Sequence, residues 1–246
     1  TASILDTIPG QVFTVGDNVL GGSTLIPDFI DCYDPSWGRH KARTRPAVGH
    51  MEGWSPGYAT YVQYFGAAAG DSGKFYYSYD LGSWHIVVLN SNASMVVGSP
   101  QEQWLKADLT THPAQCTLAI WHLPRFSSTS SSGLPVVNDA VKPLWDDLYA
   151  AGAEIVLNAH YEVYERFAPQ RSDGTADPQL GIRQFTVGTG GIGSNAFSGG
   201  TLANSEVHNT QTPGVLKLTL GSNGYAWQFI PIAGKSFTDS GTGACH

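Results

Sequence analysis

Apolar and polar residues follow one another along this chain in short runs that glycine, proline and asparagine interrupt. Nearly continuous apolar runs at 84–89, 116–121 and 153–157 predict strands that are buried on both faces, as in a parallel sheet between layers. β-forming and alternating runs predict further strands at 11–15, 46–48, 75–79, 184–187, 215–220 and 225–230, the last two joined as a hairpin at Asn223-Gly224.

Helices are predicted between the buried strands. Ser99 is a favourable N-cap, Pro100 suits the first helical position, and Glu102 stands in the capping-box position. A second helix over 138–151 presents apolar side chains at helical spacing and stops at Gly152. A helix end is also predicted over 1–8. Helices among strands, followed by strands alone, predict one layered α/β domain over 1–246.

Composition narrows the possible functions. The formal net charge is −7 and charged residues make up 13 %, so a phosphate-neutralising nucleic-acid binder is not expected. A 41 % hydrophobic content with 7 Trp, 11 Tyr and 10 Phe can fill a core, which argues against disorder. No apolar run approaches the ~20 residues of a membrane span.

The polar residues are mainly Ser, Thr, Asn and Gly rather than Lys and Glu, which favours a secreted or extracytoplasmic protein. The three cysteines, Cys32, Cys116 and Cys245, allow at most one internal disulfide and leave one thiol over.

Polar side chains gather where the predicted strands stop. Asp17, His50, His122 and His160 each follow a different strand, and the carboxyl ends of strands line the site in open α/β sheets. Three imidazoles and one carboxylate are a ligand set that suits Zn, Fe or Mn. Position alone leaves surface or capping roles for these residues open.

The order of short motifs resembles the calcineurin-like metallophosphoesterase superfamily, on the side of the secreted purple-acid-phosphatase-like enzymes. The resemblance covers nearly the whole chain and implies a four-layer α/β/β/α sandwich. The matching segments are VGDN at 15–18, YDPSWGR at 33–39, RPAVG at 45–49, LNSN at 89–92, QEQWL at 101–105, AIWHLPRFSS at 119–128, VLNAHYEVYERFAP at 156–169 and GTGG at 188–191.

The resemblance assigns roles to the residues after the strands. Asp17 matches the metal-bridging Asp of the family, and His50 falls on the Asn of its G-N-H-E motif. His122 matches the His of H-x-P, and His160 the first His of G-H-x-H. These four would hold one divalent or trivalent transition metal ion.

A second metal site is expected to be lost, because ligand positions of the family are altered. Leu20 stands where purple acid phosphatases have a Tyr, and Glu162 replaces the second His of the last motif. Met51 takes the place of a proton-transferring His, and Leu123 that of a second His in near relatives.

The resemblance therefore implies a metal-dependent, phosphoesterase-like hydrolase of a small, anionic substrate. We expect His50, His122 and Glu162 to take part in catalysis, Glu162 as a base beside the metal; a salt bridge from Glu162 to Arg166 is the alternative. A basic run over 39–45 would either attract the anion or form a solvated loop. Two other hypotheses remain: a repurposed mononuclear Fe, Mn or Zn enzyme of non-phosphatase chemistry, and an inactive binding module.

One feature of the family has no counterpart in this sequence. Its first strand, which carries an Asp motif, should precede Thr1. Two strands beside that position would then lack a partner, and unpaired edges recruit strands. We expect an upstream segment or another chain to supply the strand, with self-association as one result.

Overall fold

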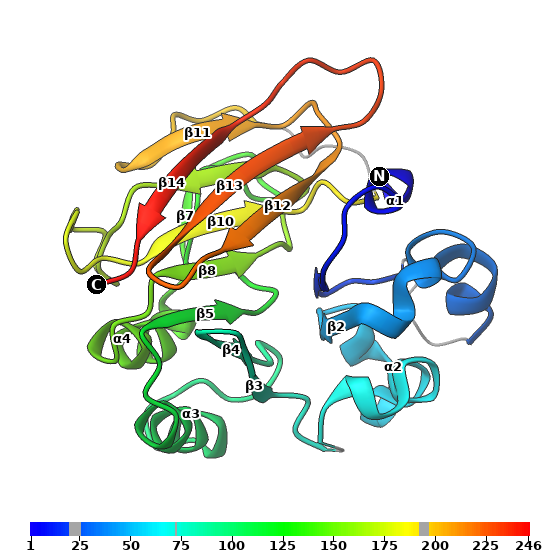
Figure 1. The fold of residues 1–246 in the computed structure, drawn as a ribbon, viewed down its shortest axis with the longest axis horizontal. Helices are drawn as coiled ribbons and strands as arrows, with labels where there is room; N and C mark the ends of the chain where they lie inside the picture. Colours follow the sequence, from blue (N-terminus) through cyan, green and yellow to red (C-terminus); the bar gives the residue numbers. More distant parts are fainter. Residues whose placement is uncertain (20–25, 72, 192–196) are drawn as a thin grey trace.

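A seven-stranded mixed sheet forms the centre of the molecule (Figure 1), in the order β11-β9-β10-β8-β5-β4-β3. The computed structural model describes residues 1–19, 26–71, 73–191 and 197–246. The four central neighbours, β4, β5, β8 and β10, run parallel, and the outer strands are antiparallel. The strands are β3 (Tyr77–Leu81), β4 (Trp84–Val88), β5 (Cys116–Ile120), β8 (Ile155–Asn158), β9 (Tyr164–Phe167), β10 (Arg183–Val187) and β11 (Ser205–Asn209).

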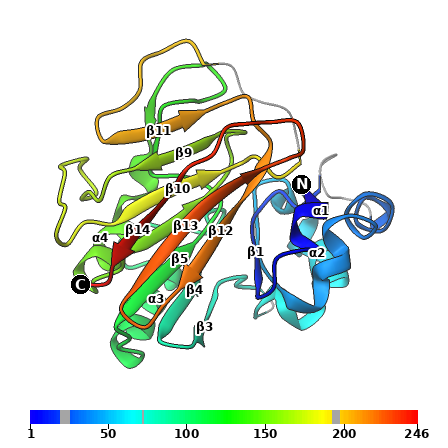
Figure 2. The same ribbon diagram turned by 45° about the horizontal axis from the view of Figure 1, so that its top comes forward.

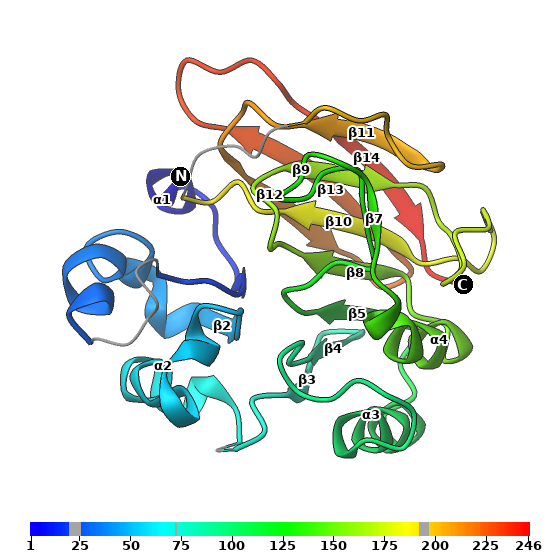
Figure 3. The ribbon, with the colours of Figure 1, turned by 180° about the vertical axis from the view of Figure 1, so that it is seen from behind.

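Two helices cover one face of this sheet (Figure 3), α3 (Pro100–Thr111) and α4 (Lys142–Ala150). Every residue of β4, β5 and β8 is buried, as their continuous apolar runs predict. Leu105 of α3 and Trp145 of α4 are fully buried in the core that they share with the sheet. The Ser99 hydroxyl accepts a hydrogen bond from the Glu102 N–H, which confirms the predicted cap of α3.

A three-stranded antiparallel sheet packs on the opposite face. It consists of β12 (Gly214–Leu220), β13 (Gly224–Pro231) and β14 (Ser240–Ala244). Trp227 and Phe229 of β13 pack in one core cluster with Phe185 of the large sheet. A disulfide joins Cys116 on β5 to Cys245 after β14, and Cys32 is an exposed free thiol. The single disulfide that the sequence allows therefore links the two sheets.

A separate parallel pair of strands, β1 (Val12–Val15) and β2 (Thr44–Ala47), lies beside the two sheets. Short helices surround it, including α1 (Ala2–Leu5), α2 (Ala59–Phe65) and the 3-10 helix Trp37–Arg43. An aromatic cluster that includes Phe29, Tyr64 and Phe65 supports this side of the molecule. Helices therefore cover one face of the large sheet and lie beside the β1–β2 pair. In the part of the chain that the structure describes, none covers the outer face of β12–β14 (Figure 1).

The free edges of β1 and β12 lie next to each other (Figure 2). Val12 of β1 packs in one apolar cluster with Val215 of β12. Within the described ranges, β1 has a ladder only with β2, and β12 only with β13. The expectation that a first strand lies between two such edges stays a prediction.

Most of the predicted strands are present, with small shifts of their ends. Sequence patterns missed β9, β11, β14, α2 and the two-residue strands β6 (Phe126–Ser127) and β7 (Val136–Val137). The predicted helix over 1–8 is one short turn, α1. Among the described residues, no helix combines the length and the apolar character that crossing a membrane requires.

Candidate metal centre

Asp17, His50, His122 and His160 converge at the carboxyl ends of four strands from two different sheets. Asp17 follows β1 and His50 follows β2, whereas His122 and His160 follow β5 and β8. One ligand atom from each of the four lies within 4.8 Å of the others. The structure thus brings together all four residues that were predicted from the sequence as metal ligands.

Asp17 and His122 form the centre of the cluster. His122 Nε2 lies 3.2 Å from Asp17 Oδ2, and His160 Nδ1 lies 3.2 Å from His122 Nε2. His50 Nδ1 is 3.6 Å from the same oxygen of Asp17. Nitrogens of His50 and His122 therefore face one carboxylate oxygen, and the His160 nitrogen lies beside that of His122.

The backbone fixes which nitrogen His122 presents. Its Nδ1 lies 2.8 Å from the Val15 carbonyl oxygen, which can only accept a hydrogen bond, so Nδ1 carries the proton. Nε2 then offers its lone pair toward the cluster when the ring is neutral. A histidine whose second nitrogen is held by a carbonyl is the usual arrangement of a metal ligand.

His50 shows that the cluster fits a metal ion. Its Nδ1 is buried, and no hydrogen-bond partner for it is present among the described residues. A buried polar atom of this kind normally has a partner, since leaving it unsatisfied costs about 1–3 kcal/mol. A cation bound by three nitrogens and one oxygen would satisfy it, and this donor set suits Zn, Fe or Mn.

Two glycines allow the loops that follow β1 and β2 to approach each other closely. A Cβ on Gly16 would lie 2.5 Å from Gly49 Cα and 2.7 Å from His122 Nδ1. A Cβ on Gly49 would lie 2.1 Å from the Asp17 nitrogen. Any side chain at either position would push Asp17 away from the histidines.

Glu52 holds these two loops together, a role that the sequence analysis did not assign. Its carboxylate is fully buried and accepts hydrogen bonds from the backbone N–H groups of Asp17, Asn18 and Gly49. The Met51 N–H in turn donates to Asp17 Oδ1 at 2.7 Å. The sequence signal for this role was Glu52 itself, the acidic residue that ends the Gly49–Glu52 motif two positions after His50.

The pKa values of the cluster reflect burial and mutual charge. Burial lowers the pKa of His160 to about 4, and the neighbouring His122 charge adds to this effect. Burial opposes ionisation of Asp17, but hydrogen bonding and charge from His122 outweigh it and lower the pKa of Asp17. Burial lowers the pKa of His122, whereas its bond to Asp17 raises it, and the net change is upward. Asp17 is therefore ionised and His160 neutral at pH 7, as ligands must be.

Glu162 does not belong to the group of atoms that converges on Asp17. It comes directly after Tyr161, which follows His160, and its predicted catalytic role stays a prediction. The alternative partner, Arg166, is bonded to Asp239 and Glu206. Leu20, the substituted Tyr position, lies outside the described residues.

The basic run over 39–45 anchors the N-terminal segment. Arg39 and His40 pair with Asp6, and Arg43 donates to the carbonyl oxygens of Leu5 and Gly10. Lys41 lies 4.1 Å from the ring centroid of Tyr64. These contacts favour a structural role over attraction of the substrate.

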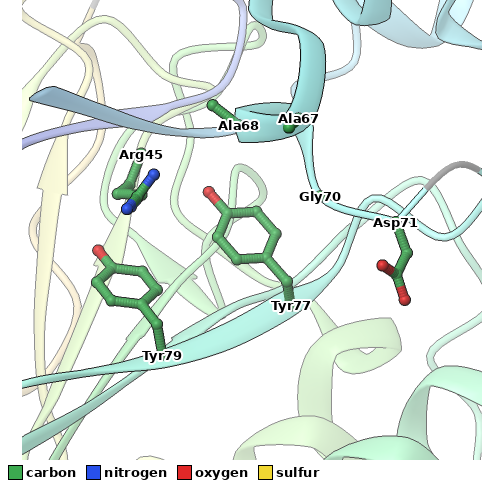
Figure 4. Close-up of a pocket in the computed structure, with 7 residues that line it drawn as sticks. All are labelled: Arg45, Ala67, Ala68, Gly70, Asp71, Tyr77 and Tyr79. Atoms are coloured by element: carbon green, nitrogen blue, oxygen red, sulfur yellow. The ribbon is translucent and has the colours of Figure 1, made fainter. Parts of the chain in front are cut away.

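A pocket of about 410 Å³ lies elsewhere, between β2 and β3 (Figure 4). The guanidinium of Arg45 stacks over the ring of Tyr79 at 5.3 Å, and Tyr77 donates to the Pro46 carbonyl oxygen. None of the four candidate ligands lines it. The residues that do are Arg45, Ala67, Ala68, Gly70, Asp71, Tyr77 and Tyr79.

Four further histidines lie outside the candidate metal centre and the basic run. His85 is buried and hydrogen bonded, and His112 and His246 are exposed. His208 is partly buried, and its Nε2 lies 2.8 Å from the Thr129 hydroxyl. The contact arises because β11 packs beside the loop after β6, a pairing that the sequence pattern did not reveal.

The layered sheets and the ligands at their strand ends define an α/β fold of the metallophosphatase class. Solved structures of this class superpose on the chain. A purple acid phosphatase, PPD1, from yellow lupin seeds matches with a TM-score of 0.76 at 17 % identity, over 98 % of this chain and 47 % of its own. GAP50, the anchor in the inner membrane complex of Plasmodium, matches with a TM-score of 0.66 at 16 % identity, over 96 % of this chain and 76 % of its own.

Within that fold class, the sequence is similar to plant purple acid phosphatases. Purple acid phosphatase 18 of Arabidopsis thaliana is 31 % identical over 129 residues, which are 50 % of this chain and 28 % of that protein. Purple acid phosphatase 13 is 32 % identical over 142 residues, 55 % of this chain and 26 % of that protein. The matched segments therefore cover about a quarter of the length of each of these relatives. No protein-family model matches it.

Proposed function

We propose that this chain is a metal-dependent hydrolase of small anionic esters, phosphate esters first among them, with one transition metal ion at Asp17, His50, His122 and His160. The convergence of these four side chains, together with a buried His50 Nδ1 that has no hydrogen-bond partner among the described residues, carries the proposal. The plant relatives, whose names describe them as purple acid phosphatases, support the choice of phosphate esters.

Each residue has a defined task in this proposal. Asp17 is kept ionised, His122 has its tautomer fixed by Val15, and Glu52 holds the loops that carry Asp17 and His50. A bound ion would supply Lewis acidity for the ester and lower the pKa of water. Glu162, close in sequence to His160, is proposed to accept the proton of the attacking water.

The sequence differences support one metal rather than two. Leu20 has no ligand atom, and Glu162 is not among the atoms that converge on Asp17. Two-metal hydrolysis relies on a pair of ions that clamp the attacking and leaving oxygens. Met51, which has no titratable proton, leaves protonation of the leaving group to water.

The test compares the wild type with the double variant Asp17→Asn/His122→Ala. We expect the variant to lose one equivalent of bound transition metal, measured by elemental mass spectrometry, and to lose turnover of an aryl phosphate. The matched control is His246→Ala, since His246 is exposed and outside the cluster. Unchanged metal content in the double variant would contradict the site, and loss of two equivalents would contradict the single-metal proposal.

The Met51 substitution also favours a second candidate, a mononuclear Fe, Mn or Zn enzyme with chemistry other than phosphate hydrolysis. It predicts the same loss of metal in the double variant, but no aryl phosphate turnover by the wild type. An inactive binding module predicts neither metal nor turnover. The two measurements together separate all three functions.

A secreted or extracytoplasmic location is part of the proposal. The Cys116–Cys245 disulfide supports it, because disulfides persist mainly in oxidising compartments. Protein isolated from its native source under thiol-blocking conditions should show the Cys116–Cys245 peptide as oxidised. Full alkylation of both cysteines without prior reduction would count against this location.

The neighbouring edges of β1 and β12 support one further element of the proposal, a strand that pairs with β1. Phe13 and Val15 of β1, and Leu216 and Leu218 of β12, are only partly buried against the same core. An added strand would cover them and satisfy the free edge of β1. A second copy of this chain or another segment of the same protein could supply it.

A further inference from the structure

The pocket between β2 and β3 is lined by an arginine whose N–H donors have no partner in the protein. Every other arginine of the chain donates to a carboxylate or to carbonyl oxygens. Arg45, the last residue of the basic run, forms no hydrogen bond or salt bridge with any described residue, and its guanidinium lies against the ring of Tyr79 instead. In a protein with a net charge of −7, this leaves a cation at a cavity without an anion beside it.

The hydroxyl of Tyr79 is a second donor without a partner in this pocket. Its oxygen is buried, and no group among the described residues forms a hydrogen bond with it. A buried hydroxyl normally has a partner, because leaving it unsatisfied is costly. Burial raises the pKa of Tyr79 more than the Arg45 charge lowers it, so the hydroxyl keeps its proton and can donate a hydrogen bond. Figure 4 shows this hydroxyl and the Arg45 guanidinium as neighbours on one side of the pocket.

The remaining wall of the pocket is fixed in place and mainly apolar. Tyr77 donates its hydroxyl hydrogen to the Pro46 carbonyl oxygen at 2.9 Å, which holds the Tyr77 ring in position. Gly70 packs against that ring: a Cβ there would lie 2.6 Å from Tyr77 Cδ1, and its φ of +82° favours glycine. The other wall residues have short apolar side chains, Ala67 and Ala68. The pocket therefore offers an apolar surface beside its two free donors.

Asp71 is the acidic residue that lines this pocket, and its charge does not neutralise Arg45. Its side chain is 77 % exposed and forms a salt bridge with Lys74 at 3.6 Å. In Figure 4 it lies at the end of the pocket far from Arg45. Solvent and Lys74 therefore compensate the Asp71 carboxylate, and the Arg45 end of the pocket stays open to an anion.

We propose that this pocket binds a small organic oxyanion, a carboxylate or a phosphate, whose charged group accepts hydrogen bonds from Arg45 and the Tyr79 hydroxyl. A guanidinium presents paired N–H donors that match two oxygens of such a group, and stacking on Tyr79 holds its plane. The apolar wall then contacts the organic part of the ligand. The volume of about 410 Å³ is that of a small-molecule site. None of the four candidate metal ligands lines the pocket, so this inference does not depend on the proposed hydrolysis.

The test is calorimetric titration with benzoate and with phenylphosphonate, and with benzamide as a neutral analogue. We expect saturable binding of at least one of the two anions, and Arg45→Gln should weaken it by about 10–100-fold, as loss of hydrogen bonds to a charged group does. Because Arg45 is exposed and donates no hydrogen bond to the described residues, its replacement should leave the fold intact. Lys235→Gln removes the same charge at an exposed position outside the pocket and should bind as the wild type does. Binding of neither anion, benzamide binding as tight as that of the anions, or equal affinity of the wild type and Arg45→Gln would overturn the proposal.

Tyr79→Phe tests the second donor, because it removes the hydroxyl and keeps the ring on which Arg45 stacks. Binding of the same anion should weaken by about 2–10-fold, the effect of one neutral hydrogen bond, and unchanged affinity would exclude the hydroxyl from the site.

The two probes also identify the charged group. Arg45-dependent binding of benzoate alone supports a carboxylate ligand, and Arg45-dependent binding of phenylphosphonate alone supports a phosphate ligand. The double variant Asp17→Asn/His122→Ala should bind the anion with wild-type affinity. Loss of binding in that variant would place the anion at the candidate metal centre and refute this proposal, whereas loss of turnover alone would leave it standing.

Discussion

At the scale of single residues, one buried carboxylate determines the shape of the candidate metal centre. Glu52 is not one of the four converging side chains, yet it accepts hydrogen bonds from the loops after β1 and β2. Burial raises its pKa, the charge of Asp17 raises it further, and the backbone N–H groups partly offset both effects. The position of Asp17 therefore depends on a residue that is not itself a ligand.

Glu52→Gln tests this dependence. The amide would bring its own N–H donors against backbone donors, which costs about 1–3 kcal/mol of folding free energy for an unsatisfied buried group. Affinity for the ion at Asp17 should fall about 10–100-fold, as for other residues that orient ligands. Calorimetric metal titration and urea unfolding measure both effects. Asp71→Asn, at an exposed ion pair, is the control, and a Glu52→Gln protein as stable and as tight-binding as this control would refute the role.

A second residue-scale prediction concerns Glu154, whose carboxylate accepts hydrogen bonds from the N–H groups of Thr117 and His246. Burial raises its pKa from the ordinary 4.5 to about 7, although those hydrogen bonds oppose the shift. Between about pH 4.5 and 7 the unfolded chain is ionised at this position while the folded chain keeps the proton. The Glu154 contribution therefore makes the free energy of unfolding fall as pH rises through this window.

Glu154→Gln should remove this contribution. Urea unfolding at several pH values would show the difference between wild type and variant changing across pH 4.5–7 and constant outside that window. A difference that does not vary with pH would show that Glu154 ionises normally in the folded protein.

At the scale of elements, sequence patterns located those strands that are buried on both faces. The runs at 84–89, 116–121 and 153–157 correspond to β4, β5 and β8. A continuous apolar run is typical of a strand whose two faces are both buried, as these are. β9 was missed because its sequence, YERF, contains two charged residues. Both are buried, and distant partners compensate them: Ser128 and Ser205 donate to Glu165, and Asp239 pairs with Arg166.

The free edge of β1 gives the element-scale prediction. If a strand pairs with β1, the backbone amides of Val12–Val15 should exchange slowly with solvent, since an additional ladder protects them. Hydrogen–deuterium exchange, with sedimentation to determine the number of copies, measures this. Rapid exchange at β1 in every concentration range, with protection of β2, would contradict strand addition.

At the scale of the whole molecule, the metal centre joins parts that no local pattern could place together. The four ligands were predictable because each follows a strand and each matches a motif. Their mutual arrangement was not, since it depends on how the β1–β2 pair sits against the large sheet. The same holds for the Cys116–Cys245 disulfide and for the pocket that Arg45 of β2 and Tyr79 of β3 line.

The most direct test of the central claim is the anomalous scattering of a crystal grown with the native metal, recorded on both sides of its absorption edge. We predict one strong peak within bonding distance of Asp17, His50, His122 and His160. A second peak beside the first, or no peak between Asp17 and His122, would contradict the mononuclear centre.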